Sequence, residues 1–202
     1  NMALRFANNN SLSSITSLPA SITGGSINLI QSQTASSSST ISFTSGIDST
    51  YKEYIFKFIN IHPASNSANF TFQASTDGGS NYNTTITTSY FEAYHAESDG
   101  ASGLGYEANK DLAQSTSFQP LFWSTGSGND ESGNGALHLF NPSSTTFVKH
   151  FMHTGSHNTS YTYAINTFMA GYFNTTSAIN AVQFKYNTDS ISTGTIKMYG
   201  VS

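Results

Sequence analysis

The sequence predicts an all-β protein, an antiparallel β-sandwich whose strand order is jelly-roll-like or simpler. From Ile27 onward, polar and apolar residues alternate with a period of two, which is typical of strands with two different faces. Clusters of Gly and Asn interrupt these stretches at short, near-regular intervals, as turns do in sandwiches. The chain has 34 Ser, 25 Thr and 19 Asn among 202 residues, and only 9% of its residues are charged. This composition lacks the Ala, Glu, Lys and Leu of a helical bundle.

The first 26 residues differ from the rest. They are rich in Asn and Ser, and Leu12, Ile15, Leu18 and Ile22 recur at a spacing near three that Pro19 interrupts. This pattern predicts an extended or short-helical arm that docks the protein to another surface, with a poorly ordered terminus as the alternative. The chain therefore divides into an N-terminal docking arm, 1–26, and a β-sandwich body, 27–202.

The strand at residues 54–62 has the clearest pattern in the body. Aromatic residues occupy one face from Tyr54 to Phe58, and isoleucines occupy the other from Ile55 to Ile61, so we expect burial on both faces. The segment 69–75 alternates as well, and the Asp-Gly-Gly-Ser run after it favours a tight hairpin turn. The other predicted strands are 38–43, 84–94, 121–124, 136–140, 145–154, 161–172, 181–186 and 195–199.

Two polar, glycine-rich stretches, 97–105 and 125–135, separate predicted strands. Both are predicted to be long surface loops, where binding residues tend to gather.

Charge and cysteine content exclude several classes of protein. Seven Lys and Arg against eleven acids, with a net charge of -4, cannot form the basic surface of a nucleic-acid-binding protein. The absence of cysteine excludes disulfides and Cys-based zinc sites. No stretch approaches the ~18 apolar residues of a membrane span, and the N-terminus lacks the apolar core of a signal peptide. We therefore expect synthesis in a cytoplasm and no membrane insertion.

Catalytic and metal-binding motifs are weak. His150, His153 and His157 would share a face of a helix, but in the predicted strand residues three apart point to opposite faces, so no metal site is predicted. The eleven acidic residues show no pattern of a glycosidase acid pair. The sequence has neither a nucleophile elbow nor a phosphate-binding loop. It predicts no catalytic residue and no cofactor.

Aromatic residues offer a possible binding site for sugars. Tyr82, in the predicted hairpin turn, and Tyr106, in a predicted loop, are the tyrosines expected to be exposed, and Asn129 and Asp130 in the loop 125–135 supply polar partners. Other aromatic residues able to stack on a sugar, although strand packing is the more ordinary role for them, are Trp123, Tyr90, Tyr94, Tyr161 and Tyr163.

Several segments resemble a group of small structural proteins from tailed phages of marine bacteria. The similar segments are RFANNNSLSSITSLP, SGIDSTYKEYIFKFINIHP, STDGGSNYN, LFNPSSTTFVKHF, AGYFNTTSAINAVQF and STGTIKMYGV. The resemblance implies a non-enzymatic structural protein on the virion exterior, a capsid decoration or a fibre, made in the host cytoplasm. It implies self-assembly as a homotrimer or other homo-oligomer and docking to other virion proteins. The alternative is a receptor-binding module that recognises host-surface glycans through its loops.

Overall fold

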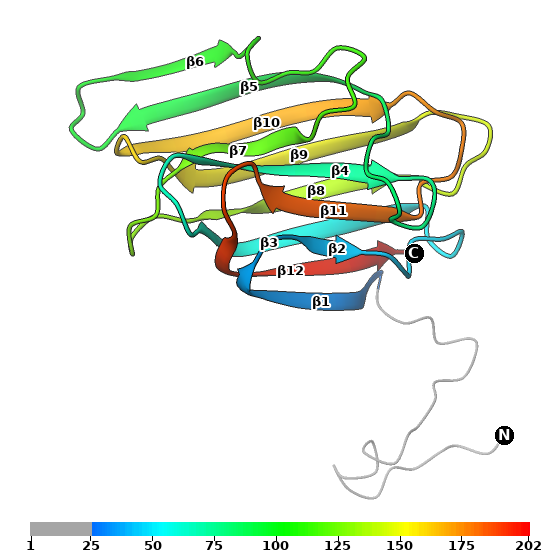
Figure 1. The fold of residues 1–202 in the computed structure, drawn as a ribbon. Helices are drawn as coiled ribbons and strands as arrows, with labels where there is room; N and C mark the ends of the chain where they lie inside the picture. Colours follow the sequence, from blue (N-terminus) through cyan, green and yellow to red (C-terminus); the bar gives the residue numbers. More distant parts are fainter. Residues whose placement is uncertain (1–25) are drawn as a thin grey trace, which may run out of the picture.

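The computed structural model describes residues 26–202, so the predicted arm residues Leu12, Ile15, Leu18 and Ile22 lie outside the described part of the chain. The described part forms twelve strands in two antiparallel sheets (Figure 1). The strands are β1 (Ile27–Ser38), β2 (Ile41–Phe43), β3 (Glu53–Pro63), β4 (Ala68–Ser75), β5 (Ile86–Ala96), β6 (Ser102–Tyr106), β7 (Gln119–Thr125), β8 (Gly133–Phe140), β9 (Lys149–Asn158), β10 (Tyr163–Phe173), β11 (Ala181–Tyr186) and β12 (Ile191–Val201). The prediction of an all-β sandwich is confirmed.

The strand order is that of a jelly roll with four extra strands. The large sheet has the order β1-β12-β3-β8-β9-β10-β5-β6, and the small sheet has the order β2-β11-β4-β7. Without the hairpins β5–β6 and β9–β10, the other eight strands follow the jelly-roll orders 1-8-3-6 and 2-7-4-5. The two extra hairpins therefore extend one sheet of the jelly roll and have no counterpart in the other sheet.

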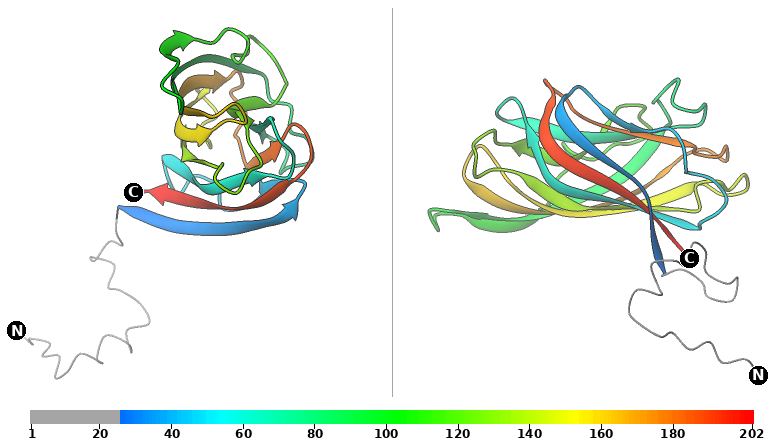
Figure 2. Two further views of the ribbon diagram at one scale, coloured as in Figure 1. Left: turned by 90° about the vertical axis from the view of Figure 1, so that its left-hand side faces the viewer. Right: turned by 90° about the horizontal axis from the view of Figure 1, so that it is seen from below.

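This extension gives the body two different edges. At one edge, β1 and β12 pair antiparallel with Ile27 opposite Val201, so the body begins and ends side by side (Figure 2). At the other edge, β5 and β6 reach beyond β7, which lies over β9 and β10 (Figure 1). The inner face of this overhang is therefore not covered by the small sheet.

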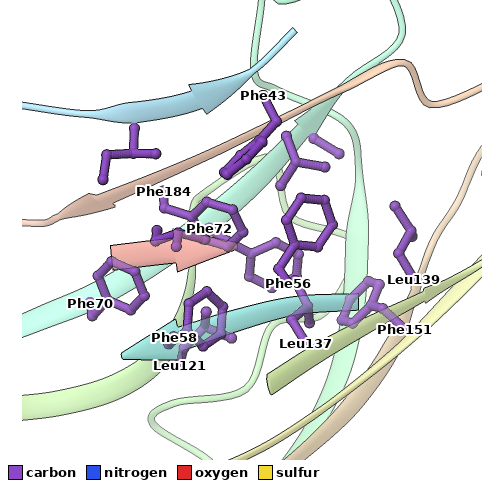
Figure 3. Close-up of a cluster of buried hydrophobic side chains, with 14 of the residues drawn as sticks. Phe43, Phe56, Phe58, Phe70, Phe72, Leu121, Leu137, Leu139, Phe151 and Phe184 are labelled. Carbon is purple, nitrogen blue, oxygen red and sulfur yellow. The ribbon is translucent and has the colours of Figure 1, made fainter. Parts of the chain in front are cut away.

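Phenylalanine side chains from both sheets fill the space between them (Figure 3). Phe58 of β3 packs edge-on against Phe184 of β11 with ring centroids 5.2 Å apart, and Phe70 of β4 stacks on Phe122 of β7 at 5.7 Å. Aromatic pairs of these geometries stabilise a core beyond the area they bury. The Phe-rich alternating segments of the sequence therefore supply the core.

The expectation that the strand around residues 54–62 is buried on both faces is only partly right. Its aromatic face is fully buried, but Lys57 and Ile59 on the other face are exposed. A bulge after Phe58, where Asn60 has φ 50°, shifts the pairing with β8 and turns Ile61 into the core. Strict alternation cannot anticipate a bulge, because one extra residue reverses the face of every residue after it.

Both predicted loops contain strand residues. β6 begins at Ser102, inside the expected loop 97–105, and ends one residue after it at Tyr106. β8 begins at Gly133, inside the expected loop 125–135. These segments have little β propensity of their own, and they pair because β5 and β9 present free edges to them. In the other direction, the predicted strand 145–154 begins only at Lys149.

Glycines in the large sheet make room for Phe122. A Cβ on Gly155 would lie 2.5 Å from the Phe122 ring, which is itself fully buried among aromatic neighbours and cannot move aside. We expect Gly155→Ala to lower the free energy of unfolding by about 1–3 kcal/mol through overpacking. The matched control is Gly105→Ala, because a Cβ there meets open space. Denaturant unfolding that gives equal stability for the two variants would contradict this account.

Candidate ligand-binding site

Residues 107–115, which follow β6, form an irregular segment over the uncovered inner face of the overhang. We call this segment the Lys110 bulge. Residues 107–115 continue along the edge of β5, with hydrogen bonds from the Glu107 amide to the Tyr90 carbonyl (2.9 Å) and from the Thr88 amide to the Leu112 carbonyl (2.8 Å). Between these bonds the backbone turns, and the Lys110 amide donates back to the Glu107 carbonyl. The turn carries the Lys110 side chain inward, where it is 8% exposed.

Side chains from β5 and β7 fix the bulge in place. The side-chain amide of Gln119 donates a hydrogen bond to the Lys110 carbonyl (2.9 Å) and accepts one from the Thr88 hydroxyl (2.7 Å). The same hydroxyl accepts a hydrogen bond from the backbone amide of Leu112 (2.8 Å). The Gln119 and Thr88 side chains that join these bonds are buried. Buried polar networks with satisfied partners rigidify the segment they hold.

Lys110 lies at the centre of a compact polar cluster. Its Nζ is 2.9 Å from a Glu92 oxygen, 3.3 Å from a Glu107 oxygen and 3.6 Å from the centre of the Trp123 ring. The Trp123 indole N–H donates to the second Glu92 oxygen at 2.7 Å. The Lys110 and Glu92 side chains are only 9% and 4% exposed. An ion pair that is desolvated to this degree is stable only with hydrogen bonds on both partners, and Trp123 provides the one that Glu92 needs.

A cavity of about 360 Å³ adjoins this cluster. The rings of Tyr94, Tyr163 and Trp123 line it together with Glu92, Glu107 and Asn109. The two tyrosine rings meet edge-on, with centroids 5.8 Å apart and an interplanar angle of 76°. All three aromatic side chains are half-buried, so the cavity opens to solvent. Its size lies at the lower end of small-molecule pockets, roughly 300–1,000 Å³.

No family model, curated protein or solved structure matches this chain. In the described residues there is also no helix of sufficient length and apolar character to cross a lipid bilayer.

None of the four residues predicted for glycan binding lines this cavity. Tyr106 is 57% exposed on β6, where its hydroxyl donates to Asp111. Tyr82 is half-buried, and its hydroxyl lies beside Gly79 in the loop after β4. Asn129 and Asp130 are exposed in the loop before β8. The structure therefore leaves these residues in separate neighbourhoods.

Three of the other aromatic residues considered for sugar stacking do converge, namely Tyr94, Tyr163 and Trp123. Sequence analysis missed their polar partners Glu92 and Lys110, because the two are 18 residues apart and only the bulge brings them together. The available signal was the only Lys or Arg between Lys57 and Lys149, followed by the only Trp in the sequence.

The three histidines of β9 divide between the two faces as predicted. His150 points outward, whereas His153 and His157 are 2% and 1% exposed in the core. Burial lowers the pKa of His153 to about 4 and that of His157 to about 3. His157 is bonded to the Trp123 carbonyl (2.9 Å), so it supports the strand that carries the indole. Within residues 26–202, no three His, Asp or Glu side chains form a group able to hold a metal ion.

Proposed function

We propose that this chain is a non-enzymatic structural protein on the exterior of a tailed-phage particle, and that it holds a neutral saccharide of the host surface in the cavity beside Trp123. The observation that carries the proposal is the combination of three half-buried aromatic rings with the hydrogen-bonded Glu92 carboxylate and the Asn109 amide in one open cavity. Ligand pockets combine apolar walls with a few placed polar groups in this way. The C–H faces of a sugar ring pack on aromatic side chains, and its hydroxyls bond to carboxylates and amides.

Charge selects among saccharides. The cavity contains the carboxylates of Glu92 and Glu107 and the single ammonium of Lys110, which leaves a net charge of about -1 near the ligand. An acidic sugar or a phosphate would be repelled at this short range. A neutral saccharide keeps the Lys110 ion pairs intact and bonds to the remaining lone pairs.

Two features support placement on a particle. The sequence resembles structural proteins of marine tailed phages, and jelly rolls form both viral capsid proteins and lectins. The segment that precedes β1 joins the body at the β1–β12 edge, whereas the cavity lies at the edge formed by β5 and β6. A protein tethered through its N-terminal segment would thus present the cavity away from the tether.

Hydrolysis of the saccharide is not part of the proposal. Glu92 and Glu107 both contact the Lys110 ammonium, so their carboxylates are close enough to suggest a glycosidase pair. Both oxygens of Glu92 accept hydrogen bonds from within the protein. We therefore propose a binding role for Glu92, which holds Lys110 and Trp123 in place, and no catalytic role.

The test is binding of neutral glycans to the full chain, first on an array and then by calorimetry. We expect Tyr94→Ala and Tyr163→Ala each to weaken binding by about 5- to 10-fold, because each removes a stacking ring worth roughly 1 kcal/mol. The matched control is Tyr161→Ala, which removes a tyrosine 60% exposed and two residues from Tyr163 but outside the cavity.

Several outcomes would contradict the proposal. They include an array on which the wild-type chain binds no neutral glycan, or a preference for acidic glycans. Equal losses for Tyr161→Ala and Tyr163→Ala would show that the cavity is not the site. A loss of glycan binding seen only in Tyr82→Ala or Tyr106→Ala would place the site at the loops predicted from the sequence.

A further inference from the structure

On the outer face of the extended sheet, five neighbouring strands carry no charged side chain at their outward positions. We use the name neutral face for the outward side chains, at alternate positions, of β6, β5, β10, β9 and β8. In sequence they fall within 102–106, 87–95, 164–172, 150–156 and 134–140, and none is Asp, Glu, Lys or Arg. On the next strand of the sheet, β3, two outward side chains are charged, namely Glu53 and Lys57. A face five strands wide without charge is unusual for a surface in contact only with water.

Large apolar side chains form a ridge at one side of this face. Leu104 is 73% exposed, Tyr106 57% and Phe91 42%. Phe91 stacks on Phe168 of β10, with centroids 5.0 Å apart and rings 10° from parallel. The stack fixes the ridge, because neither ring can turn without losing its partner.

The other side of the neutral face is hollowed. A hollow of about 590 Å³ lies over Ala170 and Ser89, and its walls are Met152, Phe140, His150 and Tyr172. Ala170 stands directly between Ser89 and Met152 in the sheet register. Small side chains at these positions therefore leave a recess next to the ridge.

We propose that the neutral face binds a second copy of this chain, sheet against sheet, in a two-fold dimer. A two-fold axis in the contact plane, between ridge and hollow, places the ridge of each copy in the hollow of the other, as an isologous interface requires. Sheets pack face to face in this way at about 10 Å separation.

Area and charge both favour a second copy as the occupant. At about 3.3 Å per residue and 4.8 Å per strand, the five strands present roughly 700 Å². A stable interface buries about 800 Å² per partner. The chain has a net charge of -4, and the outward strand positions of the neutral face carry none of it, so two copies would meet there without a charged side chain at the centre of the contact. The carboxylates of Asp99, Glu53 and Asp111 border the face, bonded to His95, His138 and Tyr106.

The dimer leaves the candidate binding site free. The cavity beside Trp123 is on the inner side of the overhang, lined by Glu92, Tyr94, Tyr163 and Ile165, which alternate with the outward residues of β5 and β10. A dimer would therefore carry two open cavities. The proposal does not depend on what those cavities hold.

The test is the mass of the full chain by light scattering after size exclusion. We expect twice the chain mass of 21.7 kDa for the wild type. Phe91→Lys on the ridge and Met152→Glu in the hollow should each give the monomer mass, with unfolding midpoints near that of the wild type. The matched control is Leu29→Lys, 56% exposed on β1 at the far edge of the same sheet, which should remain dimeric.

Mixing the two monomeric variants tests the geometry itself. The lysine introduced on the ridge of one copy would meet the glutamate introduced in the hollow of the other. The mixture of Phe91→Lys and Met152→Glu should therefore regain the dimer mass. A monomeric wild type, a trimer, or a dimer that survives Phe91→Lys would overturn the proposal. So would a mixture that stays monomeric.

Discussion

Replacing Lys110 with methionine is expected to lower the free energy of unfolding by about 3–5 kcal/mol, the largest effect of any single side chain in the candidate site. The variant keeps the length of the side chain but removes the ammonium, so the carboxylate of Glu92, 4% exposed, loses its counter-charge. The remaining hydrogen bond from Trp123 at 2.7 Å cannot replace an ion pair in this position. Equilibrium denaturation with urea measures the loss.

Two further variants separate charge from packing. Lys57→Met removes an exposed lysine of β3, 5.6 Å from the Tyr199 ring, and should cost less than about 1 kcal/mol. The double variant Lys110→Met with Glu92→Leu removes both charges and should regain most of the lost stability. It should nevertheless bind saccharide more weakly, because the Glu92 carboxylate and the Lys110 ammonium no longer line the cavity. A loss below about 1 kcal/mol for Lys110→Met would contradict the buried ion pair.

Stability is expected to fall by about 4 kcal/mol as the pH is lowered from about 7.5 to about 5. Burial is the main cause that lowers the pKa of His153 to about 4 and of His157 to about 3, and for His157 the nearby charge of Lys110 acts in the same direction. Both histidines stay neutral in the folded state over this range, but in the unfolded chain they take up protons below about pH 6.5. Each therefore favours unfolding by about 2 kcal/mol at about pH 5.

A substitution in the same strand tests the assignment. His157→Gln removes one titrating group and can retain a hydrogen bond to the Trp123 carbonyl, so the fall over this pH range should be about half as large. His150→Gln, on the exposed side of β9, should leave the fall unchanged. The three carboxylates with lowered pKa, Asp48, Asp77 and Asp189, are protonated at lower pH than this range. An unchanged pH dependence in His157→Gln would contradict the prediction.

Much of the fold could be predicted from local pattern. The alternation in residues 69–75 and 181–186 placed β4 and β11 close to their observed bounds, since one face of each is packed with aromatic residues. The pattern failed for β6 and for the start of β8, where glycine-rich segments pair only because a neighbouring strand offers a free edge. It also could not locate the bulge after Phe58 that turns Ile61 into the core.

The candidate site was predictable only in part. Tyr94, Tyr163 and Trp123 were among the aromatic residues considered for sugar binding, but the sequence favoured Tyr82 and Tyr106 because turns are usually exposed. Exposure alone does not make a cavity, since Tyr106 stands on an outward face and Tyr82 packs against Gly79.

The sequence by itself determined the class of the fold, because a period of two and the spacing of turns depend only on neighbouring residues. It also determined that β9 would place His150 and His153 on opposite faces. Only the tertiary structure decided that two hairpins extend one sheet of the jelly roll, which leaves an inner face for the Lys110 bulge and a neutral outer face. Such pairings join residues far apart in the chain, and their stability comes from packing and desolvation that no local pattern records.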